Sequence, residues 1–264
     1  MTTTARIILT GATGGIGRAI AQALAAQGAA LLLVGRRADA LEDLRRELAR
    51  SDDSVTCVCA DLTTGEGREA IATAARQFSA NTLINNAGVN TFALLEGQSE
   101  ADIERQLNTN LIAPMLLTRR ILPLLASEAD AYVLNIGSAF GSIGFAGFAP
   151  YCASKFGLRG FSEALRRELA DSTIRVGYLA PRSTHTALNS RQVVAMNAEL
   201  GNAVDAPAVV ADAVVRMVKK REALRHIGQP ERFFARLNAV LPSLVDNALK
   251  AKLPIIRRHA EHRE

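Results

Sequence analysis

The sequence of 264 residues contains no tryptophan, and aromatic residues make up only 5% of it. A core must therefore be built from Ala, Leu, Ile and Val, in a chain that is 48% hydrophobic and 22% charged. Cysteine is scarce too: Cys57 and Cys59 occupy alternate positions, which face opposite ways on a strand, and Cys152 stands alone. These three suit neither a disulfide nor a shared metal ion. An odd count without a secretory leader predicts a cytoplasmic protein.

Long apolar runs are also missing. No stretch reaches the ~20 apolar residues of a membrane span, and the first residues run directly into an apolar segment, which leaves no room for a signal peptide. Glycine (19) and proline (8) are ordinary, which excludes collagen-like and low-complexity chains. Lys and Arg exceed Asp and Glu by 31 to 26. An excess of five positive charges is compatible with nucleic acid, an anionic cofactor, a membrane surface, or no charged partner.

Short apolar segments alternate with longer segments of helical period along most of the chain. Strands are expected at residues 6–10, 30–35, 55–60, 82–85, 131–137 and 174–180, with a short seventh near 226–228. Helices or helix pairs are expected at 16–27, 38–50, 65–78, 99–126 and 151–170. The strands are apolar nearly throughout, as they are when helices cover both faces of a sheet. This pattern predicts one α/β domain with a doubly wound parallel sheet at residues 1–229 and a C-terminal extension at 230–264.

A glycine-rich segment, Thr-Gly-Ala-Thr-Gly-Gly-Ile-Gly, follows the first strand and opens the first helix. Glycines there allow a tight turn and let the backbone approach a pyrophosphate at the helix N-terminus. The expected contacts are Gly11, Thr13, Gly15, Ile16 and Gly17. The segment fits both TGxxxGxG and TGxxGxxG, and a plain strand–helix turn without a ligand is the alternative.

The end of the second strand reads Gly35-Arg36-Arg37. A site for NAD would place an acidic residue about 20 residues beyond the glycines, where it accepts a hydrogen bond from the ribose 2′-hydroxyl. Arginine instead pairs with a 2′-phosphate. The sequence therefore predicts NADP(H), with Arg36 as the main contact and Arg37 as a weaker one. Alternatively, both arginines simply begin a solvated helix.

Three further segments make a family resemblance specific. They are Leu-Ile-Asn-Asn-Ala-Gly at residues 83–88, Ile-Gly-Ser at 136–138, and Tyr-Cys-Ala-Ser-Lys at 151–155. With the glycine turn they resemble the short-chain dehydrogenase/reductase family over about residues 6–228, which implies a Rossmann-type fold. The chain length and the gap of 13 residues from Ser138 to Tyr151 favour the short reductase branch of that family.

Reduction of a carbonyl by hydride leaves an alkoxide, which needs a positioned acid. Tyr151 carries a phenol with an ordinary pKa of about 10, and Lys155, one helical turn on, would favour its ionised form. Ser138 can hydrogen-bond the substrate oxygen. The resemblance implies that Asn110 holds a water molecule that relays protons to Lys155. The alternative for Asn110 is an amide satisfied inside its own helix.

The resemblance also implies further cofactor contacts, with Asp61 at the adenine and Lys155 at the nicotinamide ribose. The expected set is Asp61, Leu62, Asn86, Ala87, Gly88, Tyr151, Lys155, Pro181, Thr184 and Thr186. One position departs from the family pattern Pro-Gly-x-x-x-Thr, because Arg182 follows Pro181. Arg182 could meet a cofactor phosphate or an acidic substrate, or lie displaced at the surface. No metal site is expected, since His259 and His262 lack a third ligand.

Residues 140–149 are uncharged and carry three phenylalanines next to Tyr151. They predict an apolar carbonyl or alcohol substrate, or alternatively packing at a subunit interface. Residues 183–206 are expected to form a flap over the substrate, with His185 facing solvent. The extension has apolar residues at intervals of three and four, and seven Lys and Arg against four Asp and Glu. Pro242 and Pro254 should divide it into short helices that pack on the domain or on a partner subunit, or lie on a membrane surface.

The sequence thus predicts an NADP(H)-dependent oxidoreductase for apolar carbonyls or alcohols. A non-catalytic NADP-sensing or scaffold protein that retains the fold is the alternative. The resemblance implies a homodimer or homotetramer built on the helices near 99–126 and 151–170. No motif supports binding of nucleic acid.

Overall fold

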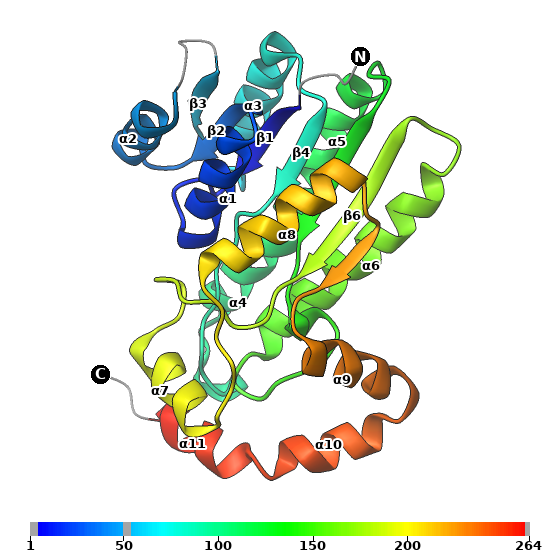
Figure 1. Ribbon diagram of the computed structural model, residues 1–264. Coiled ribbons are helices and arrows are strands. Elements are labelled where there is room, and N and C mark those ends of the chain that lie inside the picture. The colour runs from blue at the N-terminus through cyan, green and yellow to red at the C-terminus, as the bar shows by residue number, and fades with distance from the viewer. Residues whose placement is uncertain (1–4, 50–53, 262–264) are drawn as a thin grey trace.

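A computed structural model describes residues 5–49 and 54–261. Its described strands form one parallel sheet of seven strands in the order β3-β2-β1-β4-β5-β6-β7 (Figure 1). The strands are β1 (Arg6–Thr10), β2 (Ala30–Gly35), β3 (Val55–Cys59), β4 (Thr82–Asn85), β5 (Ala131–Ile136), β6 (Ile174–Ala180) and β7 (Leu224–His226). The predicted doubly wound sheet is confirmed. The seventh strand begins two residues earlier than predicted.

The position of the site follows from the strand order. Every residue of β4 and β5 is buried, since helices cover both of their faces. From β1 the chain adds β2 and β3 on one side of the sheet and then β4 to β7 on the other side. The direction in which strands are added therefore reverses between β1 and β4. Loops at the carboxyl ends of these two strands diverge there and leave a crevice, where α/β sheets bind their ligands.

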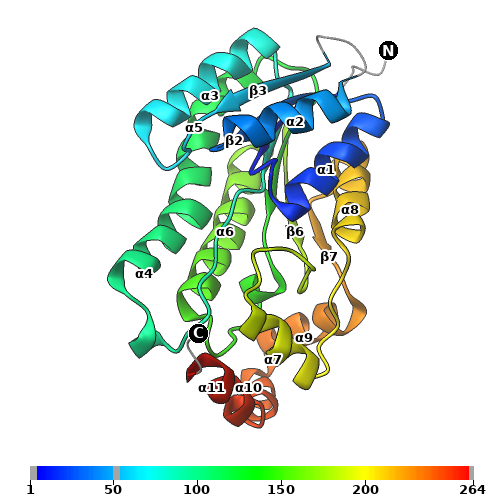
Figure 2. The ribbon, with the colours of Figure 1, turned by 90° about the vertical axis from the view of Figure 1, so that its left-hand side faces the viewer.

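Helices cover the sheet in two layers, as Figure 2 shows from the side. One layer consists of α1 (Gly15–Ala26), α2 (Ala38–Leu48) and α8 (Pro207–Lys220), and packs through residues such as Ile20 and Val214. The other consists of α3 (Gly65–Phe78), α5 (Ala113–Leu125) and α6 (Ala149–Glu168), and packs through residues such as Ile71 and Leu117. The predicted end of the second helix, Arg50, lies outside the described residues.

The predicted helical region 99–126 is a pair of helices joined by a π-turn. Helix α4 (Glu100–Leu107) passes into a π-turn at Asn108–Ile112, and α5 follows directly. One extra residue in such a turn disrupts the regular hydrogen-bond ladder, a feature often found at functional sites. Asn110 is the buried residue of this turn.

The C-terminal extension forms three short helices beyond one end of the sheet, next to α7 (Arg191–Glu199) (Figure 1). They are α9 (Gln229–Val240), α10 (Pro242–Lys250) and α11 (Leu253–Glu261). Pro242 opens α10 and Pro254 is the second residue of α11, so the predicted breaks are confirmed. Val245 and Ile256 are buried, so one face of the extension packs on the domain. No helix in the described ranges is long and apolar enough to cross a membrane.

Candidate active site

The turn between β1 and α1 requires glycine at two positions, Gly11 and Gly17. Gly11 has a φ of +65°, and a Cβ built on it would lie 2.8 Å from the Cα of Ala87. A Cβ on Gly17 would overlap the carbonyl oxygen of Gly11. Gly14 precedes α1, and no side chain caps the helix there. The first amide groups of α1 can therefore meet an anion such as a pyrophosphate.

Asn86, predicted as a cofactor contact, braces this turn. Its Nδ2 donates to the carbonyl oxygens of Thr10 (2.9 Å) and Gly11 (3.2 Å). In return the Thr10 hydroxyl accepts from the backbone nitrogens of Asn86 (3.0 Å) and Ala87 (3.1 Å). The loop after β4 is thereby fixed against the glycine turn. Both amide hydrogens of Asn86 have acceptors in the protein, so this side chain shapes the crevice.

Two arginines and one carboxylate lie at the expected adenosine end. Arg36 and Arg37 are exposed after β2, and neither forms an ion pair within the described part of the chain. The Asp61 Oδ1 accepts from the backbone nitrogen (2.9 Å) and the hydroxyl (2.7 Å) of Thr63. These bonds, aided by the Arg36 charge, lower the pKa of Asp61. Leu62 is buried beside it. This end of the crevice thus presents unpaired guanidinium groups.

Ser138 and Tyr151 meet at the carboxyl end of β5. Ser138 precedes a short 3-10 turn, Ala139–Gly141, and its hydroxyl accepts from the backbone nitrogen of Phe140 (3.1 Å). Tyr151 lies in the first turn of α6 and is half-buried. Burial raises the pKa of Tyr151 to about 12, while its hydrogen bond with the Ser138 side chain acts in the opposite direction. The two hydroxyls predicted to act on a substrate oxygen are therefore side by side.

Lys155 lies one turn further along α6 and is buried. Its Nζ donates to the carbonyl oxygen of Ile136 (3.0 Å) and lies 5.7 Å from the centre of the Tyr151 ring. Burial lowers the pKa of Lys155 to about 8. A Cβ built on Gly88 would lie 3.7 Å from this Nζ, so the loop after β4 borders the ammonium group.

The amide of Asn110 is satisfied by partners outside its own helix, so the alternative hypothesis of an amide satisfied inside that helix is wrong. Its Oδ1 accepts from the backbone nitrogen of Val89 (2.8 Å), and its Nδ2 donates to the Val89 carbonyl oxygen (2.8 Å) and the Ser154 hydroxyl (3.1 Å). Asn110 therefore fixes the loop after β4 next to α6. The proton relay through this residue stays a prediction.

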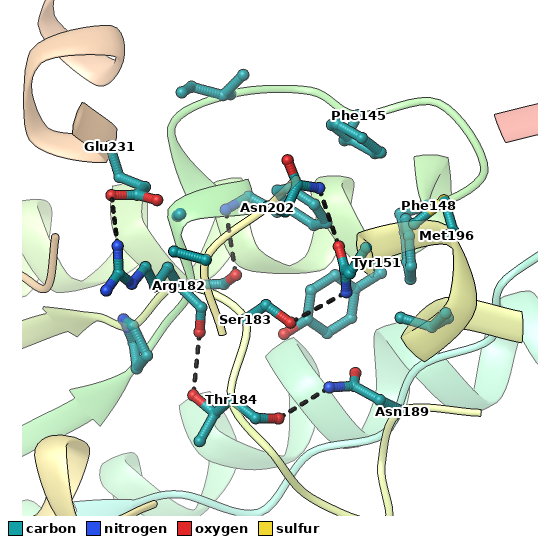
Figure 3. A pocket seen from close by; sticks show the side chains of 18 of the residues that line it. Phe145, Phe148, Tyr151, Arg182, Ser183, Thr184, Asn189, Met196, Asn202 and Glu231 are labelled. Atoms are coloured by element: carbon teal, nitrogen blue, oxygen red, sulfur yellow. Dashed lines mark hydrogen bonds and ion pairs between the residues drawn. The ribbon is translucent and has the colours of Figure 1, made fainter. Parts of the chain in front are cut away.

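A cavity of about 460 Å³ opens at Ser138 and Tyr151 (Figure 3). Ile16, Pro181, Thr184 and Thr186, which the sequence predicts to contact the cofactor, line it. Phe140, Phe145, Phe148, Val193 and Met196 form an apolar wall, and the extension adds Phe234, Val245, Leu249 and Lys252. Residues 140–149 thus contribute to the cavity wall, and the apolar substrate predicted from them stays a prediction. His185 is exposed, as predicted, and the expected flap contains α7.

Comparison with known proteins decides the family. Residues 5–197 match the family model for short chain dehydrogenases. The chain belongs to the short-chain dehydrogenase/reductase family. It is 34% identical over 230 residues to nodulation protein G of Rhizobium sp. (strain N33), covering 85% of this chain and 93% of that protein. It is 32% identical over 221 residues to 3-oxoacyl-(acyl-carrier-protein) reductase of Bos taurus, covering 82% and 92%.

The solved structure of a short chain dehydrogenase/reductase from Burkholderia phymatum, in complex with NAD, shares this fold. Its TM-score is 0.82 at 21% identity, over 92% of this chain and 96% of that one. The protein described here is thus a short-chain dehydrogenase/reductase, an oxidoreductase of a family that uses nicotinamide cofactors.

Arg182 in this short-chain dehydrogenase/reductase lines the cavity and forms ion pairs there. Its guanidinium pairs with Asp205 through two hydrogen bonds, Nε to Oδ2 (2.9 Å) and Nη2 to Oδ1 (2.7 Å). Its Nη1 lies 3.7 Å from the Glu231 Oε2 in α9, and Figure 3 shows these two side chains pointing toward each other. Two carboxylates thus already face this charge, and contact of Arg182 with a cofactor phosphate or an acidic substrate stays an open alternative. Arg182 joins the end of β6 to the flap and to the extension.

Tyr178, on β6, is a residue that motif reasoning missed. Its hydroxyl lies 3.3 Å from the backbone nitrogen of Ser138 and 3.4 Å from the Lys155 carbonyl oxygen. A Cβ on Gly137 or Gly141 would overlap its phenol ring or hydroxyl, so the ring needs both glycines. In the sequence Tyr178 is one more apolar position of a buried strand, and nothing there links it to glycines some 40 residues earlier.

Proposed function

We propose that this protein is an NADP(H)-dependent oxidoreductase that interconverts apolar carbonyl compounds and their alcohols. The observation that carries the proposal is the pair of hydroxyls of Ser138 and Tyr151 at the mouth of a largely apolar cavity. Rings line this cavity close to the acid: the ring centre of Phe148 lies 6.3 Å and that of Phe140 6.5 Å from the Tyr151 ring centre. Such walls bind apolar surface, while the hydroxyls orient one polar atom.

The residues of the crevice fit a nicotinamide dinucleotide. The glycine turn and the uncapped start of α1 would hold its pyrophosphate, and Lys155 its nicotinamide ribose. When bound, the cofactor supplies or accepts the hydride. Ser138 then orients the substrate oxygen, and Tyr151 donates its phenolic proton to it during reduction. The positive charge of Lys155 stabilises the phenolate that remains.

The preference for NADP(H) rests on the end of β2. Arg36 and Arg37 are exposed there, and neither has a carboxylate partner in the described ranges. Guanidinium groups bind a phosphate with charge-assisted hydrogen bonds, whereas an NAD site places a carboxylate at this point. The NAD bound in the Burkholderia phymatum structure describes the cofactor of that protein and does not bear on the preference proposed for this one.

The test is a panel of apolar aldehydes and ketones with NADPH, followed at the absorbance of the reduced cofactor. The wild type should oxidise NADPH with at least one of them, and Tyr151→Phe should lower kcat by about a thousandfold, since it removes the acid. Cofactor affinity should stay unchanged in Tyr151→Phe. Tight NADPH binding without turnover of any carbonyl would instead favour an NADP-sensing or scaffold protein.

We also propose that the protein forms a homodimer or homotetramer through α5 and α6. Four large apolar side chains are exposed on these helices and on the preceding π-turn: Ile112, Met115, Leu116 and Phe156. Burial against a second copy would remove them from water. Light scattering should give a dimeric or tetrameric mass that Phe156→Glu lowers; a wild-type monomer would contradict the proposal.

For the outer face of the extension we propose contact with an anionic membrane surface. The extension exposes the apolar residues Phe233 (62%), Val240 (75%), Leu241 (47%) and Leu244 (54%), and the basic residues Arg232, Arg236 and Lys250 in the same two helices are exposed too. Exposed apolar side chains flanked by cations bind at an anionic interface. The wild type should sediment with phosphatidylserine vesicles, and Val240→Asp with Leu241→Asp should abolish this. A wild type that stays in the supernatant would refute the idea.

A further inference from the structure

The extension contributes one cation to the wall of the cavity. Three charged residues line this cavity: Arg182, Glu231 and Lys252. The first two face each other, and Arg182 is also paired with Asp205. Lys252, between α10 and α11, has no carboxylate within ion-pair distance in the part of the chain that the structure describes. It is the cavity cation whose charge the described protein leaves uncompensated.

The ammonium group of Lys252 forms a single long hydrogen bond among the described residues. Its Nζ donates to the Asn202 Oδ1 over 3.4 Å, which is long for a hydrogen bond. The Asn202 amide donates to the Asn197 Oδ1 (2.9 Å), and Asn197 donates to the Ser183 hydroxyl (3.2 Å), as the dashed lines of Figure 3 show. An ammonium has three donors. This chain of amides orients Asn202 but offers Lys252 only one acceptor.

The surroundings of Lys252 make an anion its natural ligand. Leu249, Val245 and Phe234 line the cavity from the same extension. A ligand that fills this space displaces water, and a charge-assisted hydrogen bond is stronger where water is excluded. The one carboxylate that lines the cavity, Glu231, faces Arg182, so its charge is partly balanced there.

We propose that the substrate is an amphipathic acid: an apolar body with the reacting carbonyl or alcohol at one end and an anionic group, such as a carboxylate, that Lys252 binds. The inference deepens the proposed function, on which it rests, by naming the class of substrate. An apolar cavity alone would accept any ketone of suitable size. A cation in its wall would select those that carry an acid.

The experiment compares 4-oxo-4-phenylbutanoate with its methyl ester, which differ in charge and share the ketone. In Lys252→Gln the KM for the acid should rise about ten- to a hundredfold, the range expected for a hydrogen bond to a charged group. The kcat, and the KM for the ester, should stay unchanged. Lys252→Arg should restore the preference for the acid. Lys250→Gln is the matched control: Lys250 is exposed two residues away and does not line the cavity.

Equal KM increases for acid and ester in Lys252→Gln would overturn the proposal and leave Lys252 as a support for Asn202. A wild type with a lower KM for the ester than for the acid would also overturn the proposal. If the wild type reduces neither compound, the proposed function fails for this class, and calorimetric binding of the acid decides the inference separately. Binding to the wild type that Lys252→Gln weakens would support it. Equal binding, or none, would overturn it.

Discussion

The Tyr178 hydroxyl lies 3.3 Å from the backbone nitrogen of Ser138 and 3.4 Å from the carbonyl oxygens of both Ser138 and Lys155. One side chain of β6 thus contacts the backbone of two residues that should act on the substrate. Burial raises the pKa of Tyr178, so it stays protonated and remains able to donate. Tyr178 is a positioning residue, because it reaches the reaction only through Ser138 and Lys155.

Tyr178→Phe should therefore lower kcat about fivefold and leave NADPH affinity unchanged, since Ser138 loses a neutral hydrogen bond of about 1 kcal/mol that holds it in position. Steady-state kinetics with a turned-over carbonyl checks this. Tyr132→Phe is the matched control: it removes a buried hydroxyl that donates to the Glu222 carbonyl oxygen (2.7 Å), between β5 and the turn before β7. Both variants should lose similar stability. Unchanged kcat in Tyr178→Phe, or an equal fall in both, would contradict the role.

The buried charge of Lys155 should destabilise the folded protein, although the proposed reaction needs it. Its pKa in the folded protein is about 8 against an ordinary 10.5, so between these pH values the unfolded chain binds more protons than the folded one. The cost of burying the charge is complete below pH 8 and disappears as the pH rises through this window. This cost amounts to about 3 kcal/mol. A variant without the ammonium group would avoid this cost but would also lose the hydrogen bond to Ile136, which contributes about 1 kcal/mol.

At pH 7 the free energy of unfolding of Lys155→Met, measured by urea denaturation, should accordingly be about 2 kcal/mol higher than that of the wild type. This gain should shrink when both are compared at pH 9.5, and activity should be lost. Lys250→Met, at an exposed position, should change neither quantity. A gain that does not depend on pH would mean that the charge of Lys155 is not its source.

Arg36 should set the cofactor preference. In Arg36→Ala the ratio of NADPH to NADH affinity should fall by about tenfold or more, because a charge-assisted pair with the 2′-phosphate is lost. NADH affinity should stay the same, and Arg37→Ala should have a smaller effect. Titration of cofactor fluorescence measures the dissociation constants of NADPH and NADH for the wild type and both variants. A wild type that binds both cofactors equally would refute the NADP(H) assignment.

The pair of Arg182 and Asp205 should stabilise the domain. Both side chains are mostly buried, at 23% and 10% exposure, and Asp205→Asn removes the nearer negative charge and leaves the more distant Glu231 as the carboxylate that faces the guanidinium. We expect a loss of about 2 kcal/mol in urea unfolding. The matched control is Asp130→Asn. The Asp130 carboxylate also accepts from the Nε and Nη2 of an arginine, Arg221, but it is 60% exposed, so this variant should lose less than about 1 kcal/mol. Similar losses in both would show that burial of the pair is unimportant.

The sequence alone determined the sheet and the position of its nucleotide end. Apolar strands separated by amphipathic helices can pack in few ways other than as a parallel sheet covered by helices. Gly11 and Gly17 are required by close backbone contacts in the turn, and their spacing is visible in the sequence. Pro242 and Pro254 likewise divide the extension where they stand, because proline is tolerated in the first turn of a helix and breaks its interior.

Only the tertiary structure decided which distant residues meet. Arg182 is bound by Asp205 and Glu231, which come from the flap and from α9, and no local pattern specifies such pairs. Tyr178 reaches Ser138 because β6 lies beside β5, and Lys252 reaches the cavity because α10 folds back over it. Local propensity and periodicity act over a few residues, whereas these contacts depend on how whole elements pack. The motifs therefore indicated the family and the residues of the candidate site, whereas only the fold showed which residues line the cavity.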